Sequence, residues 1–165
     1  MGAGYHGGFG QTKGADKKAH TSNSLPRRKS DYTRNEIIAE LMGVTEVSDT
    51  VARLINEGKI RITLLSDELF ESYLGKSRDV GGTQKGNMIY LRRSVENLFS
   101  TVVHEGTHVL DFYKGVPQNE IGSFSGEAQA YINEHAFQKE KGQKLEHENI
   151  DDIKIFVAMN YKRRN

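Results

Sequence analysis

The sequence predicts an α+β fold in which a small sheet packs against several amphipathic helices. Two short runs rich in aliphatic and aromatic residues, 60–65 and 87–91, are typical of strands. Between Ser94 and Tyr113, apolar residues recur at the three- and four-residue spacing of a helix. Because further amphipathic segments precede and follow these elements, helices are expected to outnumber strands.

Two helices are expected before the sheet. Thr33 and Glu36 have the spacing of a capping box, and the apolar-faced segment that follows them ends at Gly43. A second helix is predicted near Glu46–Glu57 and stops at Gly58. Ordered structure is therefore expected to begin close to Thr33.

The predicted sheet contains two short strands, 60–65 and 87–91. A helix over 68–74, capped by Ser66 or Asp67, is expected between them. The polar, glycine-rich stretch after this helix is predicted to be a loop and a turn that leads into the second strand. An amphipathic helix near residues 150–161 is expected to complete the fold.

The long helix after the second strand is predicted to start at a cap on Ser94 and to stop at Gly115 and Pro117. Its apolar stripe lies nearly opposite His104 and His108 on a helical wheel. The helix should therefore bury one side in the core and turn both histidines toward a cleft.

This helix carries His104-Glu105-Gly106-Thr107-His108, an HExxH pattern. Histidines four positions apart lie roughly 40° apart around a helix axis, so both imidazoles can reach one metal ion. Glu105 projects beside the pair, where a carboxylate can accept a proton from an activated water. The pattern thus supplies two candidate zinc ligands, His104 and His108, and a candidate general base.

A third ligand is expected from another helix, since catalytic zinc usually takes three protein ligands. Glu127 lies 19 residues after His108, which leaves room for a turn and a returning helix capped near Ser125. Glu134 and His135, about two turns further along, are alternatives for the third ligand.

At these residues the chain resembles the zincin metallopeptidases, specifically the gluzincin type with an HExxH helix and a Glu on a following helix. The resemblance implies that His104, His108 and Glu127 bind Zn²⁺ and that Glu105 is the base. It implies hydrolysis of peptide bonds in a protein or peptide substrate. Candidates for stabilising the oxyanion are Tyr113, Tyr131 and Tyr161.

The resemblance covers mainly residues 60–137. The metzincin subgroup fits poorly, because its third histidine would fall at Lys114 and its glycine at Asp111. Zincin-like enzymes commonly place an edge strand before the metal-binding helix, and peptide substrates pair with it. The resemblance therefore implies that 87–91 is an edge strand.

Residues 1–30 are expected to form a flexible, basic, glycine-rich leader, and 31–165 a zincin-like domain. Residues 1–35 contain seven Lys and Arg against two Asp, a charge of +5, whereas residues 36–165 contain 16 against 20, a charge of −4. The run Gly7–Gly14 resembles the junction before the C-terminal toxin domain of bacterial polymorphic toxins. That resemblance implies secretion or delivery into the cytoplasm of a target cell, otherwise a cytoplasmic location, and an immunity protein as a partner.

Composition narrows the alternatives. The 165 residues include no cysteine, which excludes a disulfide framework and a cysteine-rich zinc site. No apolar run reaches membrane-spanning length. A net charge near zero and a leader without interleaved aromatics disfavour nucleic acid as a partner. Two other functions stay open: a non-enzymatic zincin-fold module of a phage or secretion system, and a nucleic-acid-directed toxin.

Overall fold

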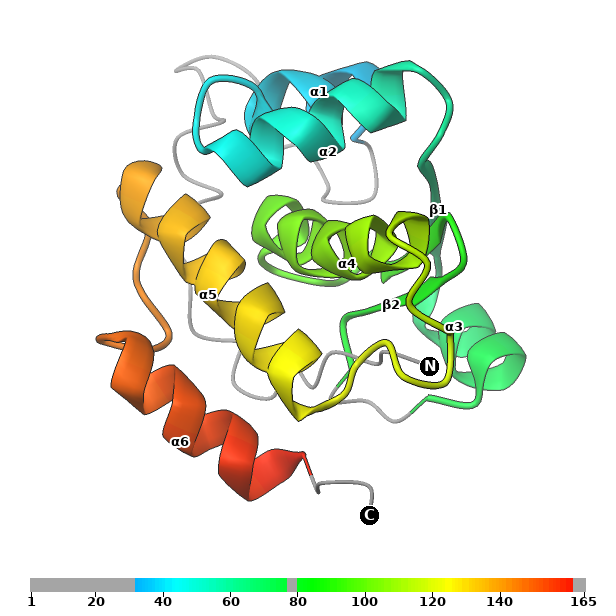
Figure 1. The fold of residues 1–165 in the computed structure, drawn as a ribbon. Coiled ribbons are helices and arrows are strands. Elements are labelled where there is room, and N and C mark those ends of the chain that lie inside the picture. The colour runs from blue at the N-terminus through cyan, green and yellow to red at the C-terminus, as the bar shows by residue number, and fades with distance from the viewer. Residues whose placement is uncertain (1–31, 77–79, 162–165) are drawn as a thin grey trace.

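The computed structural model describes residues 32–76 and 80–161 (Figure 1). Within these ranges it contains six helices and a three-stranded sheet, so the α+β prediction is confirmed. The helices are α1 (Arg34–Leu41), α2 (Glu46–Asn56), α3 (Asp67–Leu74), α4 (Leu98–Tyr113), α5 (Phe124–Glu140) and α6 (Ile150–Asn160). The strands are β1 (Arg61–Leu65), β2 (Gly82–Lys85) and β3 (Met88–Arg92). The predicted leader, residues 1–30, lies outside the described residues.

The sheet has the order β1-β3-β2, with β1 parallel and β2 antiparallel to β3. The prediction that residues 87–91 form an edge strand is wrong, because β3 pairs on both sides. The stretch predicted as a glycine-rich turn is also different, since Gly82–Lys85 forms strand β2. The turn between β2 and β3 is confined to a tight corner at Gly86, whose φ of 59° suits glycine. Ile89 and Leu91, both completely buried, suit a central strand.

Two helices begin at residues other than those predicted. α4 begins at Leu98 with Asn97 as its N-cap residue, and Ser94, predicted as the cap, instead donates a hydrogen bond to Asp67. α5 begins at Phe124, so Ser125 lies inside the first turn rather than at the cap.

For α1 and α3, the structure has the N-terminal caps that were predicted. Thr33 accepts a hydrogen bond from the backbone of Glu36 at the start of α1. Of the two caps predicted for α3, Ser66 is the one used. α2 has a reciprocal capping box between Thr45 and Ser48, which fixes its start.

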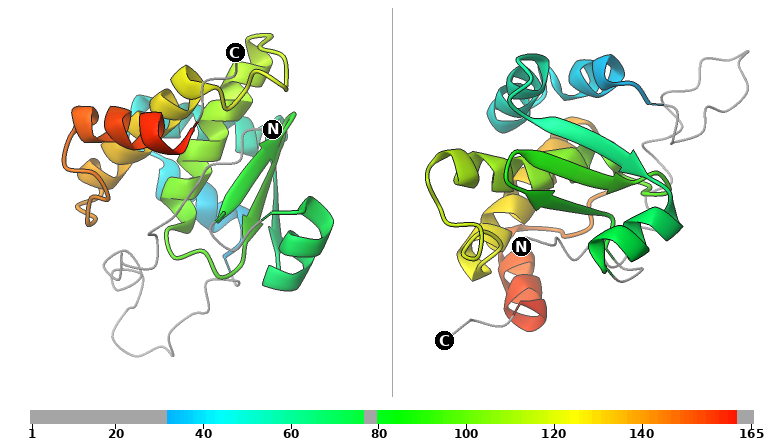
Figure 2. Two further views of the ribbon diagram at one scale, coloured as in Figure 1. Left: turned by 90° about the horizontal axis from the view of Figure 1, so that it is seen from below. Right: turned by 90° about the vertical axis from the view of Figure 1, so that its right-hand side faces the viewer.

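α4 is the central element of the fold. The sheet lies between α4 and α3, while α1 and α2 lie on one side of α4 and α6 lies on the opposite side of the molecule, packed on α5 (Figures 1 and 2). Eleven of the 16 residues of α4 are buried. The helix is therefore covered all round, not along a single stripe. Within the described ranges, no helix combines the length and the apolar character needed to cross a bilayer.

α2 packs tightly against α4 at Gly106. A β-carbon built on Gly106 would lie 2.7 Å and 2.8 Å from the two methyl groups of Val51. The first variable position of the HExxH pattern therefore lies against the main hydrophobic core, which contains Val51 of α2 and Leu98, Val102, Val103 and Val109 of α4.

Candidate metal site

α4 presents His104 and His108 on the face that α5 covers. The two imidazole rings lie one helical turn apart, with centroids 5.1 Å from each other. Both side chains are completely buried, as is Glu105. The expectation that the histidines face a cleft is therefore not met, because α5 packs directly on their side of α4.

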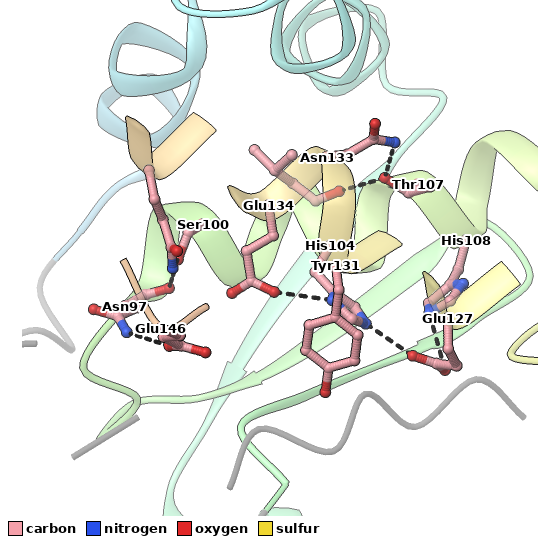
Figure 3. Close-up of polar contacts among 12 residues, drawn as sticks. Asn97, Ser100, His104, Thr107, His108, Glu127, Tyr131, Asn133, Glu134 and Glu146 are labelled. Atoms are coloured by element: carbon pink, nitrogen blue, oxygen red, sulfur yellow. Dashed lines mark hydrogen bonds and ion pairs between the residues drawn. The ribbon is translucent and has the colours of Figure 1, made fainter. Parts of the chain in front are cut away.

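α5 runs antiparallel to α4 and brings Glu127 between the two histidines (Figure 3). Glu127 Oε2 lies 3.2 Å from His104 Nε2, and Glu127 Oε1 lies 3.3 Å from His108 Nε2. One donor atom from each of the three residues lies within 4.8 Å of the other two. The three residues predicted as ligands are thus brought together, and this group could hold a metal ion.

The chemistry of the group fits a metal ion. Among the described residues, neither ring nitrogen of His108 has a hydrogen-bond partner, although both are buried. The 3.3 Å contact with Glu127 Oε1 is close but lacks hydrogen-bond geometry, and that oxygen also has no partner within the described ranges. Buried polar atoms without partners cost about 1–3 kcal/mol each. A cation bound by His108 Nε2 and Glu127 Oε1 would remove that cost for these two atoms.

Glu134, predicted as an alternative third ligand, contacts the other nitrogen of His104. Its Oε2 lies 3.0 Å from His104 Nδ1, so the imidazole lies between Glu127 and Glu134 (Figure 3). A carboxylate at Nδ1 holds the proton there and leaves Nε2 free to bind a metal ion. His135, the other alternative, is not part of the three-residue group. The geometry favours Glu127 as the third ligand and Glu134 as the residue that orients His104.

The positive charge of a protonated histidine and the negative charges of the glutamates offset one another in this group. Burial would lower the pKa of His104, but the carboxylates of Glu127 and Glu134 outweigh it and hold this pKa well above its usual range. Burial would likewise raise the pKa of Glu127, but the neighbouring His108 and His104 lower it to about 2. Without a metal ion, the carboxylate of Glu127 and a protonated His104 therefore stabilise each other.

Glu105 lies beside strand β2, since a β-carbon built on Gly82 would lie 3.2 Å from Glu105 Cγ. Burial raises the pKa of Glu105 to about 7, against the opposing effect of His104 and His108. A carboxylate with a pKa near neutrality can both accept and return a proton at physiological pH.

A polar network that the sequence reasoning missed extends from Glu134 toward the N-terminus of α4. Gln138 donates to Ser100, and Asn97 donates to Glu146, which lies on the segment after α5 (Figure 3). Burial and the nearby Glu134 carboxylate raise the pKa of Glu146 to about 9. The available signal was the spacing of 127, 134 and 138, which lie on one face of a helix.

The tyrosines predicted as oxyanion stabilisers are separated by the structure. The hydroxyl of Tyr113 donates a hydrogen bond to the backbone carbonyl of Lys59, between α2 and β1. Tyr131 packs its ring edge-on against His104, with centroids 4.5 Å apart. Its hydroxyl lies 3.0 Å from that of Tyr161. Tyr131 and Tyr161 thus remain beside the candidate site, and Tyr113 does not.

A surface groove of about 790 Å³ lies between α1 and α2. Its lining includes Ile38, Met42 and Ala52 but none of the histidines or glutamates of the candidate site. This groove is therefore separate from the buried group, which is identified by its donor atoms.

Comparisons with known proteins returned no similarity: no family model, no curated protein and no solved structure matches the chain.

Proposed function

We propose that the chain is a zinc-dependent metallopeptidase with a zincin-like fold. The observation that carries this proposal is the group of His104, His108 and Glu127, with Glu105 beside it on the same helix. Two imidazoles and one carboxylate are a common ligand set for catalytic zinc. They leave the fourth coordination position of the metal ion for a water molecule. A non-enzymatic module would have no need for the carboxylate of Glu105.

Each residue of the group has a distinct role in the proposed reaction. His104, His108 and Glu127 hold the metal ion, and Glu134 keeps the His104 ring in place through Nδ1. Bound zinc would supply Lewis-acid activation of a water molecule and of the scissile carbonyl. Glu105 accepts the proton of the attacking water and passes it to the leaving amine.

The arrangement of β2 supports a peptide as the substrate. Among the described residues, β2 is an edge strand of the sheet, antiparallel to β3, and it runs beside the helix that carries Glu105. An edge strand offers backbone donors and acceptors that can pair with an extended peptide. Strand 82–85 therefore replaces 87–91 as the proposed partner of a peptide. Because Gly82, Thr83 and Gln84 are buried, such pairing requires the residues that cover this edge to move aside.

The experiment that tests the activity compares single variants for zinc content and hydrolysis. Purified protein is expected to hold close to one zinc ion per chain, and His104→Ala or His108→Ala to abolish tight binding. Glu105→Gln should retain zinc but lose hydrolysis of a proteome-derived peptide library. A wild-type chain that takes up no zinc would refute the metal site. A zinc-loaded wild-type chain that cleaves nothing would refute the peptidase.

We further infer that this peptidase is a toxin delivered into the cytoplasm of a target cell, with an immunity protein as its partner. The lack of cysteine suits refolding in a reducing compartment. The glycine-rich, basic composition of residues 1–30 suits a connection to a delivery region. Expression of the chain inside bacteria should arrest growth, and Glu105→Gln should relieve the arrest at equal protein level. Arrest that persists in Glu105→Gln would favour the nucleic-acid-directed alternative.

A further inference from the structure

At Gly82, β2 lies close to α4 and beside the proposed base. A β-carbon built on Gly82 would lie 2.9 Å from Thr101 Cγ2, 2.9 Å from Leu91 Cδ2 and 3.2 Å from Glu105 Cγ. Distances under 3.0 Å essentially never occur for real β-carbons. The strand backbone can therefore lie this close to Glu105 only because residue 82 has no side chain.

Two of the three neighbours have little freedom to move. Thr101 is completely buried on α4, and its β-branched side chain is stiff about χ1. Leu91 is completely buried within the main hydrophobic core, where displaced atoms meet close-packed neighbours. A side chain at position 82 would therefore displace either the β2 strand or Glu105.

The β2 strand itself is held at its far end. The side-chain amides of Gln84 and Gln118 exchange two hydrogen bonds of 3.1 Å, which join β2 to the loop between α4 and α5. Gln118 also accepts a hydrogen bond of 2.9 Å from the backbone of Gly86. Because the strand is tied to this loop, it cannot slide freely away from α4, and the contact with Glu105 must change.

We propose that Gly82 is a positioning residue for Glu105. The bare backbone of β2 is the wall against which the Glu105 side chain rests, and it sets where the carboxylate lies relative to His104 and His108. This inference rests on the proposed function of Glu105 as the proton acceptor. Gly82 lies on strand β2, outside the HExxH pattern, and the rate of the reaction depends on it.

The test is Gly82→Ala in the full chain. Zinc affinity, measured by competition with a chelator, should stay within about threefold of wild type, because no ligand is touched. The kcat for peptide hydrolysis should fall roughly tenfold to a hundredfold with little change in KM, since a misplaced base slows the chemical step. Gly126→Ala is the matched control: its β-carbon would meet only Ser123 Oγ at 3.5 Å and Asp111 Oδ2 at 3.8 Å, both ordinary contacts.

A second variant separates displacement of Glu105 from general damage. Thr101→Ser removes the methyl group that lies 2.9 Å from the added β-carbon, so Gly82→Ala/Thr101→Ser should recover part of the lost kcat. If Gly82→Ala alone fails to fold, this double variant carries the comparison with wild type. The proposal would be overturned if the kcat of Gly82→Ala equals that of the wild type, or if the variant loses zinc in parallel with its loss of kcat.

The proposal can fail separately from the proposed function. If wild-type protein binds zinc but hydrolyses nothing, the ¹³C chemical shift of the Glu105 carboxyl carbon in metal-free protein becomes the readout. That shift should move in Gly82→Ala and stay in Gly126→Ala. An unmoved shift in Gly82→Ala would overturn the positioning role whatever the activity of the chain.

Discussion

Gly106→Ala is expected to destabilise the protein, although alanine is normally the better residue inside a helix. Helix propensity alone favours alanine over glycine by about 1 kcal/mol. Here the added β-carbon would lie 2.7 Å and 2.8 Å from the methyl groups of Val51, which is completely buried. Overpacking of this kind costs about 1–3 kcal/mol. The net effect should therefore be a loss of roughly 1 kcal/mol in the free energy of unfolding.

A double-mutant cycle isolates the contact. Val51→Ala removes both methyl groups and leaves the new β-carbon 3.4 Å from Val51 Cβ, an ordinary contact distance. In that background Gly106→Ala should stabilise the protein by about 1 kcal/mol, so the coupling between the two sites should be about 2 kcal/mol. Urea unfolding of metal-free protein measures each corner of the cycle. If Gly106→Ala stabilises the wild-type chain, or acts equally in both backgrounds, the packing of α2 on α4 described above is wrong.

Three further predictions concern the charged groups. Glu134→Gln should weaken zinc binding about 10- to 100-fold by loosening the His104 ring, while Glu140→Gln, on the exposed end of the same helix, should leave the affinity unchanged. Because the pKa of His104 is raised well above its usual range, zinc must displace a proton at neutral pH, and affinity should fall about tenfold for each pH unit lowered. Calorimetry in buffers of different ionisation enthalpy should detect about one proton released per zinc bound, and none would contradict this assignment. Burial raises the pKa of Glu146 to about 9 in the folded protein, whereas in the unfolded chain this carboxyl loses its proton above pH 4.5. Between pH 4.5 and 9 the folded state therefore binds more protons, and the contribution of Glu146 makes the free energy of unfolding fall as pH rises. In urea unfolding of metal-free protein, Glu146→Gln should flatten that decline, and an unchanged slope would show that the carboxyl is solvated.

The grouping of His104, His108 and Glu127 could be predicted from the sequence because it depends largely on local geometry. His104, Glu105 and His108 take their relative positions from the helix alone, and the separation of 19 residues to Glu127 leaves only a short connection and a returning helix. The choice among Glu127, Glu134 and His135 needed the structure. It depends on which turn of α5 faces each nitrogen of His104, and residue spacing does not determine that.

The order of the strands could not be predicted, since it depends on contacts between distant residues. Gly82-Thr83-Gln84-Lys85 has no apolar alternation, so nothing local marks it as a strand. It becomes one because β3 offers a free edge and because Gly82 allows the chain to approach α4. The burial of the histidine face was missed for a similar reason: a helical wheel shows polarity but not what packs against it.

The packing of α6 has a consequence for how the molecule opens. Ile153 and Val157 of α6 form a hydrophobic cluster with Ala128 and Tyr131 of α5, separate from the main core. A helix that is attached through a satellite cluster can detach as a local unit with less free energy than global unfolding requires. Tyr131 belongs to that cluster and also packs on His104. The detachment of α6 would therefore loosen the packing of Tyr131 against the candidate metal site while the sheet and α4 stay folded. In amide hydrogen exchange, α6 would then be less protected than α4 and the sheet, although it packs on α5, the helix that carries Glu127.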